Sequence, residues 1–155
     1  MKLRLMVVVA GLLCVCVFAT AGCAAGTFFG IPLGGASGQQ DKAEDAAAKS
    51  LVRNAMTALE SSYIDLRTFE PGTMTPEELV WIEPTIEWTV APGADEAFDP
   101  VGCVAEDNEV CYWGTWDTYA VGTESESDTT FGVYVDKGAG GGNTFYIDGV
   151  AVDSW

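Results

Sequence analysis

The sequence predicts an α+β domain in which one long helix packs on an antiparallel sheet of four to five strands. Residues 41–66 contain neither glycine nor proline and repeat apolar side chains at helical spacing. From residue 85 onward, apolar and polar residues alternate over short segments, as they do in half-buried strands. A long helix followed by a run of strands is the order expected of an α+β domain, which we place at residues 41–155.

Residues 1–22 have the layout of a signal peptide. Lys2 and Arg4 precede an uncharged apolar run, and small residues follow it. The run covers about 14 residues, fewer than the ~20 that a membrane-spanning helix needs, although an uncleaved anchor is an alternative. We therefore expect the rest of the chain to be exported.

Two cleavage sites compete at the end of this segment. Cleavage after Ala21 would release a secreted protein, whereas Ala-Gly-Cys at 21–23 resembles the end of a bacterial lipobox, with Thr20 in place of the usual leucine. Two of the five cysteines leave with the signal, so lipidation of Cys23 leaves an even pair. We expect a lipid anchor at Cys23 that holds the protein on the outer face of the cell membrane.

A tether and a strong negative charge follow the signal. Residues 23–40 are rich in glycine and carry no charge, as is typical of flexible linkers. All 23 acidic residues and five of the seven basic ones follow Cys23, so the exported part has a net charge of −18. A field of that sign repels phosphate backbones and anionic lipids, which argues against nucleic acid as a partner.

The first predicted helix has one apolar stripe, formed by Ala48, Leu51, Val52, Ala55, Met56, Leu59, Tyr63 and Leu66. Side chains three and four residues apart share a helix face, so this stripe is expected to pack on the sheet. Asp45, Lys49 and Arg53 are also four apart, with the acid in the favourable N-terminal place. We expect these three side chains to face solvent.

A second, short helix is predicted after Thr75. Thr75 is a favourable N-cap, Pro76 suits the first helical position, and Glu78 completes a capping box. The helix should end before Pro84. Its apolar face is expected to consist of Leu79, Val80 and Ile82.

The remaining elements are predicted to be strands at residues 85–90, 110–121, 129–135, 143–147 and 150–155. An acidic loop, residues 91–109, separates the first two of these strands. Asp148-Gly149 is a strong signal for a two-residue hairpin turn. Cys103 and Cys111, in an exported protein, are expected to form a disulfide that ties the acidic loop to the next strand.

Catalytic constellations are scarce in this sequence. There is no histidine, which removes Ser-His-Asp and Cys-His catalysis and histidine metal sites. Residues 138–142 are glycine-rich but lack the Lys-Ser/Thr ending of a phosphate-binding loop. We therefore expect a protein that is not an enzyme.

Two groups of residues are candidates for binding. The acidic loop offers carboxylates for calcium at Asp95, Asp99 and Asp107, although a charged loop of this kind is more often simply solvated. Aromatic residues gather at Tyr112, Trp113, Trp116 and Tyr119. On one continuous strand, Tyr112 and Trp116 share one face and Trp113 and Tyr119 the other. The second face is either exposed for glycan or protein contact, or covered by the acidic loop as core.

Four segments resemble the globular part of type IV pilins and type II secretion pseudopilins, especially those of Gram-positive bacteria. They are EDAAAKSLVRNAMTALESSYIDLRTF at 44–69, TPEELVWIEP at 75–84, TYAVGTESESDTTFGVYVD at 118–136 and NTFYIDGVAV at 143–152. The N-terminus departs from that family, because no glutamate follows a Gly-Phe cleavage site and no continuous apolar helix leads into the domain. The resemblance implies a pilin-like head on a lipid tether.

These observations predict a non-catalytic envelope protein that presents its head for protein contact or adhesion, associated with a pilus or type II secretion-like apparatus. Its expected partners are proteins at the cell envelope, and the membrane through the lipid anchor. The alternative is an extracytoplasmic module that binds a glycan or calcium.

Overall fold

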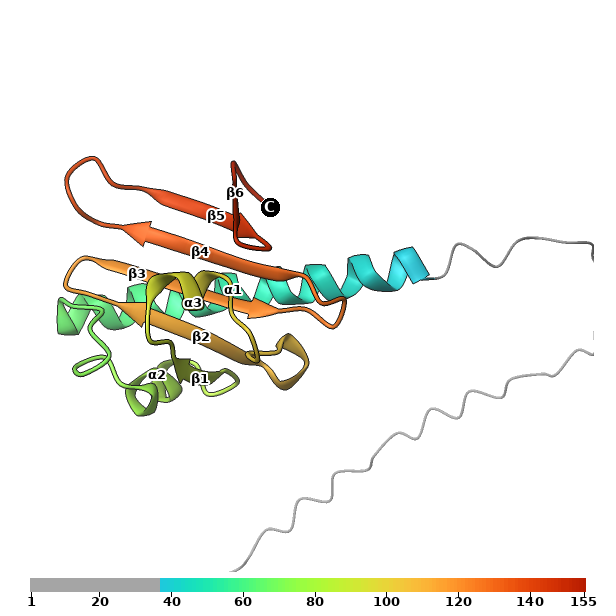
Figure 1. Ribbon diagram of the computed structural model, residues 1–155. Coiled ribbons are helices and arrows are strands. Elements are labelled where there is room, and N and C mark those ends of the chain that lie inside the picture. The colour runs from blue at the N-terminus through green and yellow to red at the C-terminus, as the bar shows by residue number, and fades with distance from the viewer. Residues whose placement is uncertain (1–36) are drawn as a thin grey trace, which may run out of the picture. The chain divides into compact units, whose positions relative to one another are not determined.

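One long helix, α1 (Ser37–Leu66), packs along one face of a six-stranded sheet (Figure 1). The computed structural model describes residues 37–155, so the predicted signal peptide, Cys23 and residues 24–36 of the predicted tether lie outside the described part. The other elements are α2 (Pro76–Ile82), β1 (Glu87–Val90), α3 (Ala94–Phe98), the 3-10 helix η1 (Ala105–Asp107), β2 (Glu109–Gly114), β3 (Thr118–Glu124), β4 (Thr130–Asp136), β5 (Asn143–Ile147) and β6 (Val150–Val152). The predicted α+β class is confirmed.

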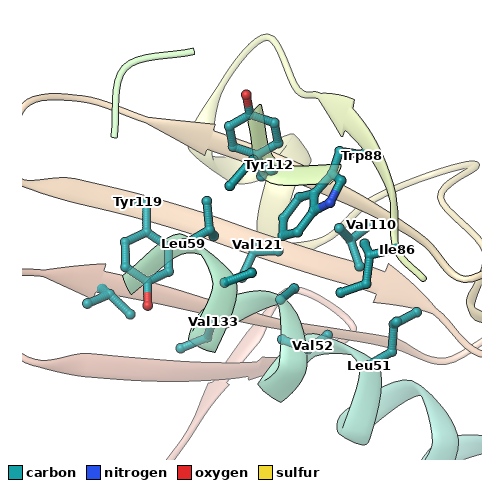
Figure 2. Close-up of a cluster of buried hydrophobic side chains, with 14 of the residues drawn as sticks. Leu51, Val52, Leu59, Ile86, Trp88, Val110, Tyr112, Tyr119, Val121 and Val133 are labelled. Atoms are coloured by element: carbon teal, nitrogen blue, oxygen red, sulfur yellow. The ribbon is translucent and has the colours of Figure 1, made fainter. Parts of the chain in front are cut away.

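Helix α1 begins four residues earlier than predicted, at Ser37, so the end of the expected tether is helical. Its predicted apolar stripe is confirmed, because Val52 and Leu59 are completely buried in the core. Figure 2 shows these side chains in one cluster with Val121 and Val133. Burial of this stripe, rather than helix propensity alone, is what holds a helix of this kind in place.

A second stripe of α1 also contacts the sheet. The carboxylate of Asp45 accepts hydrogen bonds from the hydroxyls of Ser125 and Ser127, at 3.0 and 2.7 Å. The Lys49 ammonium lies 4.6 Å from the centre of the Phe131 ring. The Arg53 guanidinium lies 5.1 Å from the Trp155 ring and donates to the Trp155 backbone oxygen. The expectation that these side chains face solvent holds for Arg53, which is exposed, but is wrong for Asp45 and Lys49, which are partly buried because the β3–β4 turn and β4 reach α1.

The strand order is β1-β2-β3-β4-β5-β6, and only the β1–β2 pair is parallel. The prediction of four to five strands is therefore wrong in number, and the predicted antiparallel pairing is confirmed for every pair except β1–β2. The predicted strand at 110–121 is two strands, β2 and β3, joined by a tight turn in which Thr115 N–H donates to the carbonyl of Thr118 at 2.8 Å. Neither glycine nor proline marks residues 115–117, so the turn carries no strong local signal.

The parallel pair follows from the segment between β1 and β2. Helix α3 and η1 lie in this segment, which was predicted to be a loop. Its return path brings β2 back beside β1 in the same direction, as a parallel pair requires. Helix α3 covers the sheet face opposite α1 (Figure 1), where Ala97 is completely buried.

Two glycines let α3 approach this second face closely. Gly122 and Gly132 are directly paired on β3 and β4. A Cβ atom at Gly122 would clash with the carbonyl of Ala97, and one at Gly132 with the backbone of Phe98. The sheet is thus covered on both faces, with α1 on one and α3 on the other.

The C-terminal hairpin forms as predicted. Asp148 and Gly149 have φ angles of 48° and 68°, and Ile147 pairs directly with Val150. Two consecutive positive φ angles are typical of the type I′ turn that joins twisted antiparallel strands.

Candidate functional site

The predicted aromatic cluster is not a surface. Tyr112 and Tyr119 are both completely buried in the core under α1, while Trp113 is half-buried against the α3 side. The predicted division of faces is wrong because the turn at 115–117 shifts the alternation between β2 and β3. Trp116, in this turn, is the one member of the four that is largely exposed, at 65%. Of the two alternatives for the sheet, core on both faces is the one that the structure shows.

Both buried tyrosines have partners for their hydroxyls. Tyr112 donates to the carbonyl of Met74 at 2.6 Å, and Tyr119 donates to the carboxylate of Glu60 at 3.0 Å. Glu60 also pairs with Lys137 at 2.7 Å. Burial raises the pKa of Tyr112, and burial together with the charge of Glu60 raises the pKa of Tyr119. These two residues therefore serve the core as neutral hydrogen-bond donors.

The calcium candidates are dispersed. Asp95 lies in the first turn of α3, Asp99 follows its last turn and accepts a hydrogen bond from Thr130, and Asp107 lies in η1. Within residues 37–155 no three histidine, cysteine, aspartate or glutamate side chains are placed to hold a metal ion together. The structure thus does not bring these three carboxylates into one site.

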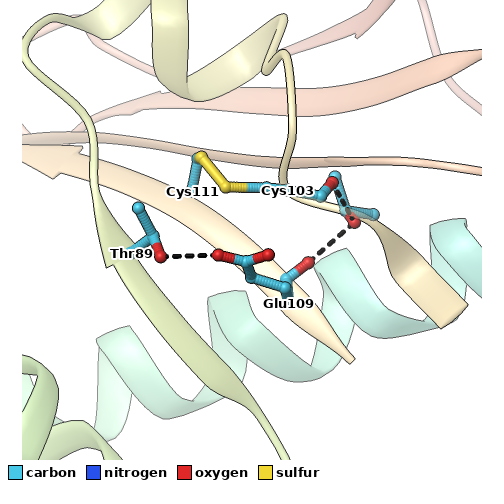
Figure 3. Close-up of a disulfide and its surroundings, with 5 residues drawn as sticks. Thr89, Cys103, Glu109 and Cys111 are labelled. Atoms are coloured by element: carbon cyan, nitrogen blue, oxygen red, sulfur yellow. Dashed lines mark hydrogen bonds between the residues drawn. A yellow bond between two sulfur atoms is a disulfide. The ribbon is translucent and has the colours of Figure 1, made fainter. Parts of the chain in front are cut away.

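The predicted disulfide is present. Cys103 and Cys111 are bonded, with their Cα atoms 5.7 Å apart, and the bridge ties the segment before η1 to β2 (Figure 3). The hydroxyl of Thr123 lies between the carbonyls of Cys103 and Glu109, at 3.0 and 2.8 Å. The bridge and these contacts hold the segment before η1 against β2 and β3.

A hollow of about 660 Å³ lies between α2 and β1. We call it the α2–β1 groove; its lining residues are Pro76, Glu77, Val80, Trp81, Pro84, Thr85, Ile86, Glu87, Trp88 and Asp107. The capping box predicted for α2 is confirmed: Thr75 and Glu78 exchange two hydrogen bonds, each of 3.4 Å. The cap fixes where α2 begins and hence which residues it turns toward the groove.

Helix α2 turns apolar side chains outward. Leu79 is completely buried, but Val80 and Ile82 are each 42% exposed and Trp81 is 88% exposed. The predicted apolar face is therefore wrong except for Leu79. Trp81 also lines a smaller hollow of about 170 Å³ on its other side, at the C-terminal end of α1. A tryptophan that is exposed to this degree between two hollows is a candidate for contact with a ligand or another protein.

The floor and the rim of the groove differ in chemistry. Ile86 and Trp88 belong to the core, and the Trp88 ring meets the Tyr112 ring edge to face, with 5.8 Å between centroids (Figure 2). Among the described residues, Trp88 Nε1 has no hydrogen-bond partner, although it is buried. The ionisable lining residues are Glu77, Glu87 and Asp107, and no basic residue joins them. The groove is thus an apolar hollow with an acidic rim.

Sequence reasoning missed Trp81 and Trp88 as site residues. One signal was present for Trp81, because a residue two positions after the buried Leu79 is turned by about 200° around the helix. No local signal identifies the hollow beside Trp88, since the groove requires that α2 and β1 be placed in three dimensions.

Comparisons with known proteins gave no match to a family model, to a curated protein or to a solved structure. Across residues 37–155, no helix combines the length and the apolar character needed to cross a membrane.

Proposed function

We propose that this chain is a non-catalytic, envelope-anchored protein whose pilin-like head binds another protein through the α2–β1 groove. The observation that supports this most strongly is Trp81, which is 88% exposed between two hollows, whereas Tyr112 and Tyr119 of the sheet are completely buried. Tryptophan is enriched at the centres of protein interfaces, because one side chain supplies a large apolar area at a small cost in conformational entropy.

The composition of the groove favours a protein over a glycan. Val80 and Pro84 flank Trp81, so the surface suits apolar side chains as well as flat rings. The lining contains no asparagine, glutamine or arginine, so a sugar would meet carboxylates as acceptors but no amide or guanidinium donor. Glycan recognition by Trp81 is the second candidate function.

The site can be tested by crosslinking in cells that express the full chain. A photoreactive residue at Thr85, an exposed position in the groove, should give crosslinks to a specific protein. The same probe at Val101, which is 96% exposed but outside the groove, should not give them. Trp81→Ala should abolish the crosslinks, whereas Trp116→Ala, which removes an exposed tryptophan elsewhere, should leave them unchanged. Equal crosslinking at both probe positions would refute the proposed contact site, and binding of purified envelope glycan that depends on Trp81 would favour the second candidate.

The anchor is part of the same proposal and has its own test. A domain with a charge of −18 is repelled by an anionic membrane surface, so acyl chains are needed to hold it there. Cys23→Ala should release the protein to the medium or leave its precursor unprocessed. An unchanged mass and an unchanged membrane fraction would contradict lipidation at Cys23.

A further inference from the structure

Strand β1 is an open edge of the sheet. It is the first strand in the order and pairs only with β2. Glu87 N–H donates to the carbonyl of Asn108 at 2.9 Å, and Ala91 N–H to that of Tyr112 at 2.8 Å. In a parallel pair, alternate residues face the neighbouring strand, so Trp88 and Val90 direct their backbone groups away from β2. Within the described part of the chain, no hydrogen bond satisfies these outward groups.

The two faces of this edge differ in chemistry. Glu87 lies directly beside Glu109 of β2, and Glu109 accepts a hydrogen bond of 2.7 Å from Thr89 (Figure 3). This face of β1 is therefore polar and negative. On the other face, Trp88 belongs to the core and lines the groove together with Val80 and Trp81. An added strand would meet carboxylates with one set of alternate side chains and apolar surface with the other.

Charge argues against a second copy of this chain as the occupant. The described residues contain 23 acidic and five basic side chains. Three of the basic residues are already engaged, Lys49 and Arg53 with aromatic rings and Lys137 with Glu60. Like charges across an edge disfavour self-association, whereas a basic segment gains from the same carboxylates.

We propose that the α2–β1 groove takes an extended segment of a partner protein in which basic and apolar residues alternate, and that this segment pairs with β1 as a seventh strand. The basic side chains lie beside Glu87, and the apolar ones lie against Trp81 and Trp88. The backbone groups of Trp88 and Val90 supply the new hydrogen bonds. This inference rests on the proposed contact function, since it specifies the partner of the same site.

The test uses the full chain in detergent micelles, labelled with ¹⁵N at tryptophan only. The chain has five tryptophans, so each backbone and indole N–H signal can be assigned by single Trp→Phe substitutions. The probe is an acetylated and amidated peptide of eight residues that alternates lysine and valine. We expect it to shift the backbone N–H of Trp88 and the indole N–H of Trp81, and to leave both signals of Trp116 unchanged.

Three comparisons separate strand addition from nonspecific attraction. A peptide that alternates glutamate and valine should bind at least tenfold more weakly. Two further lysine–valine peptides carry N-methyl groups, one on the valines and one on the lysines. At least one of them should lose tenfold or more in affinity, because the direction of the segment decides which set of backbone N–H groups faces β1. Glu87→Lys should reduce the preference for the lysine peptide over the glutamate peptide, because Glu77 and Asp107 remain in the lining. Asp153→Lys, a matched charge reversal at an exposed position, should leave that preference unchanged.

The outcomes distinguish this inference from the function on which it rests. Full binding of both N-methylated peptides, or equal binding of the glutamate peptide, would overturn strand addition by a basic segment. So would the absence of any shift at Trp88. If crosslinks from Thr85 still depend on Trp81 in that case, the contact function stands and only the nature of the partner is wrong. If those crosslinks are also absent, both proposals fail.

Discussion

The aromatic residues beneath α1 and those of the α2–β1 groove differ in burial and in hydrogen bonding. Beneath α1, Tyr112 and Tyr119 are completely buried and both hydroxyls donate hydrogen bonds. In the groove, Trp81 is 88% exposed, and the buried Nε1 of Trp88 has no partner among the described residues. The two regions are neighbours, because the Trp88 and Tyr112 rings are in contact. They differ in whether their polar atoms have hydrogen-bond partners and in how much apolar area is exposed.

This difference indicates that the aromatic residues beneath α1 stabilise the domain, whereas those of the α2–β1 groove are available for binding. A buried polar group with a partner costs little, whereas one without a partner carries its desolvation cost in the folded state. Exposed apolar area likewise forgoes the hydrophobic stabilisation that burial would give. We therefore expect substitutions beneath α1 to act on stability, and substitutions in the groove to act on binding.

The largest effect on stability is expected from Leu59→Ala. Leu59 is completely buried between α1 and the sheet, so its truncation should lower the free energy of unfolding by about 2–5 kcal/mol. Ile64→Ala is the matched control on the same helix, because Ile64 is 66% exposed, and it should change stability by less than about 0.5 kcal/mol. Urea unfolding followed by circular dichroism measures both. Equal losses for the two variants would mean that α1 does not divide into a buried and an exposed face.

The disulfide gives the next largest effect. Replacing Cys103 and Cys111 together by alanine should lower the free energy of unfolding by about 2–3 kcal/mol, as the chain-entropy estimate for a short loop gives. Reductant should destabilise the wild-type head by a similar amount and leave the double variant unchanged. A wild-type head that is indifferent to reductant would show that the α3 side of the sheet does not depend on this bridge.

A smaller effect is expected from Tyr112→Phe, which leaves the carbonyl of Met74 without its buried donor. The loss should be about 1–3 kcal/mol. Tyr146→Phe is the control, because Tyr146 is only partly buried and its hydroxyl makes no hydrogen bond to the described residues; its effect should stay within about 0.5 kcal/mol. If the two variants were equally stable, the hydrogen bond of the Tyr112 hydroxyl would not contribute to the free energy of unfolding.

The sequence correctly predicted those elements that depend only on residues close together in the chain. The stripe of α1, the capping box at Thr75 and the Asp148-Gly149 turn each depend on residues within one turn or one helix, and each was confirmed. The cysteine pair was predicted on the expectation that the chain is exported, and the structure joins the two cysteines.

Features that depend on tertiary structure were not predicted. The parallel β1–β2 pair depends on the path of the segment that contains α3. The turn at 115–117 contains neither glycine nor proline and so is not marked in the β-rich run that it interrupts. The missed turn also explains the wrong assignment of Tyr112 and Tyr119 to opposite faces. The exposure of Trp81 was not predicted, because tertiary packing decides which side of a short apolar helix is buried.

The smallest effect on stability, and the largest on binding, is expected from Trp81→Ala. Because 88% of Trp81 is already exposed, its removal should change the free energy of unfolding by no more than about 0.5 kcal/mol. The same substitution should abolish crosslinking from Thr85, since interface tryptophans of this kind contribute a large share of binding free energy. Trp116→Ala should change neither quantity. A loss of more than about 2 kcal/mol for Trp81→Ala would place this side chain in the core and remove the distinction between the two regions.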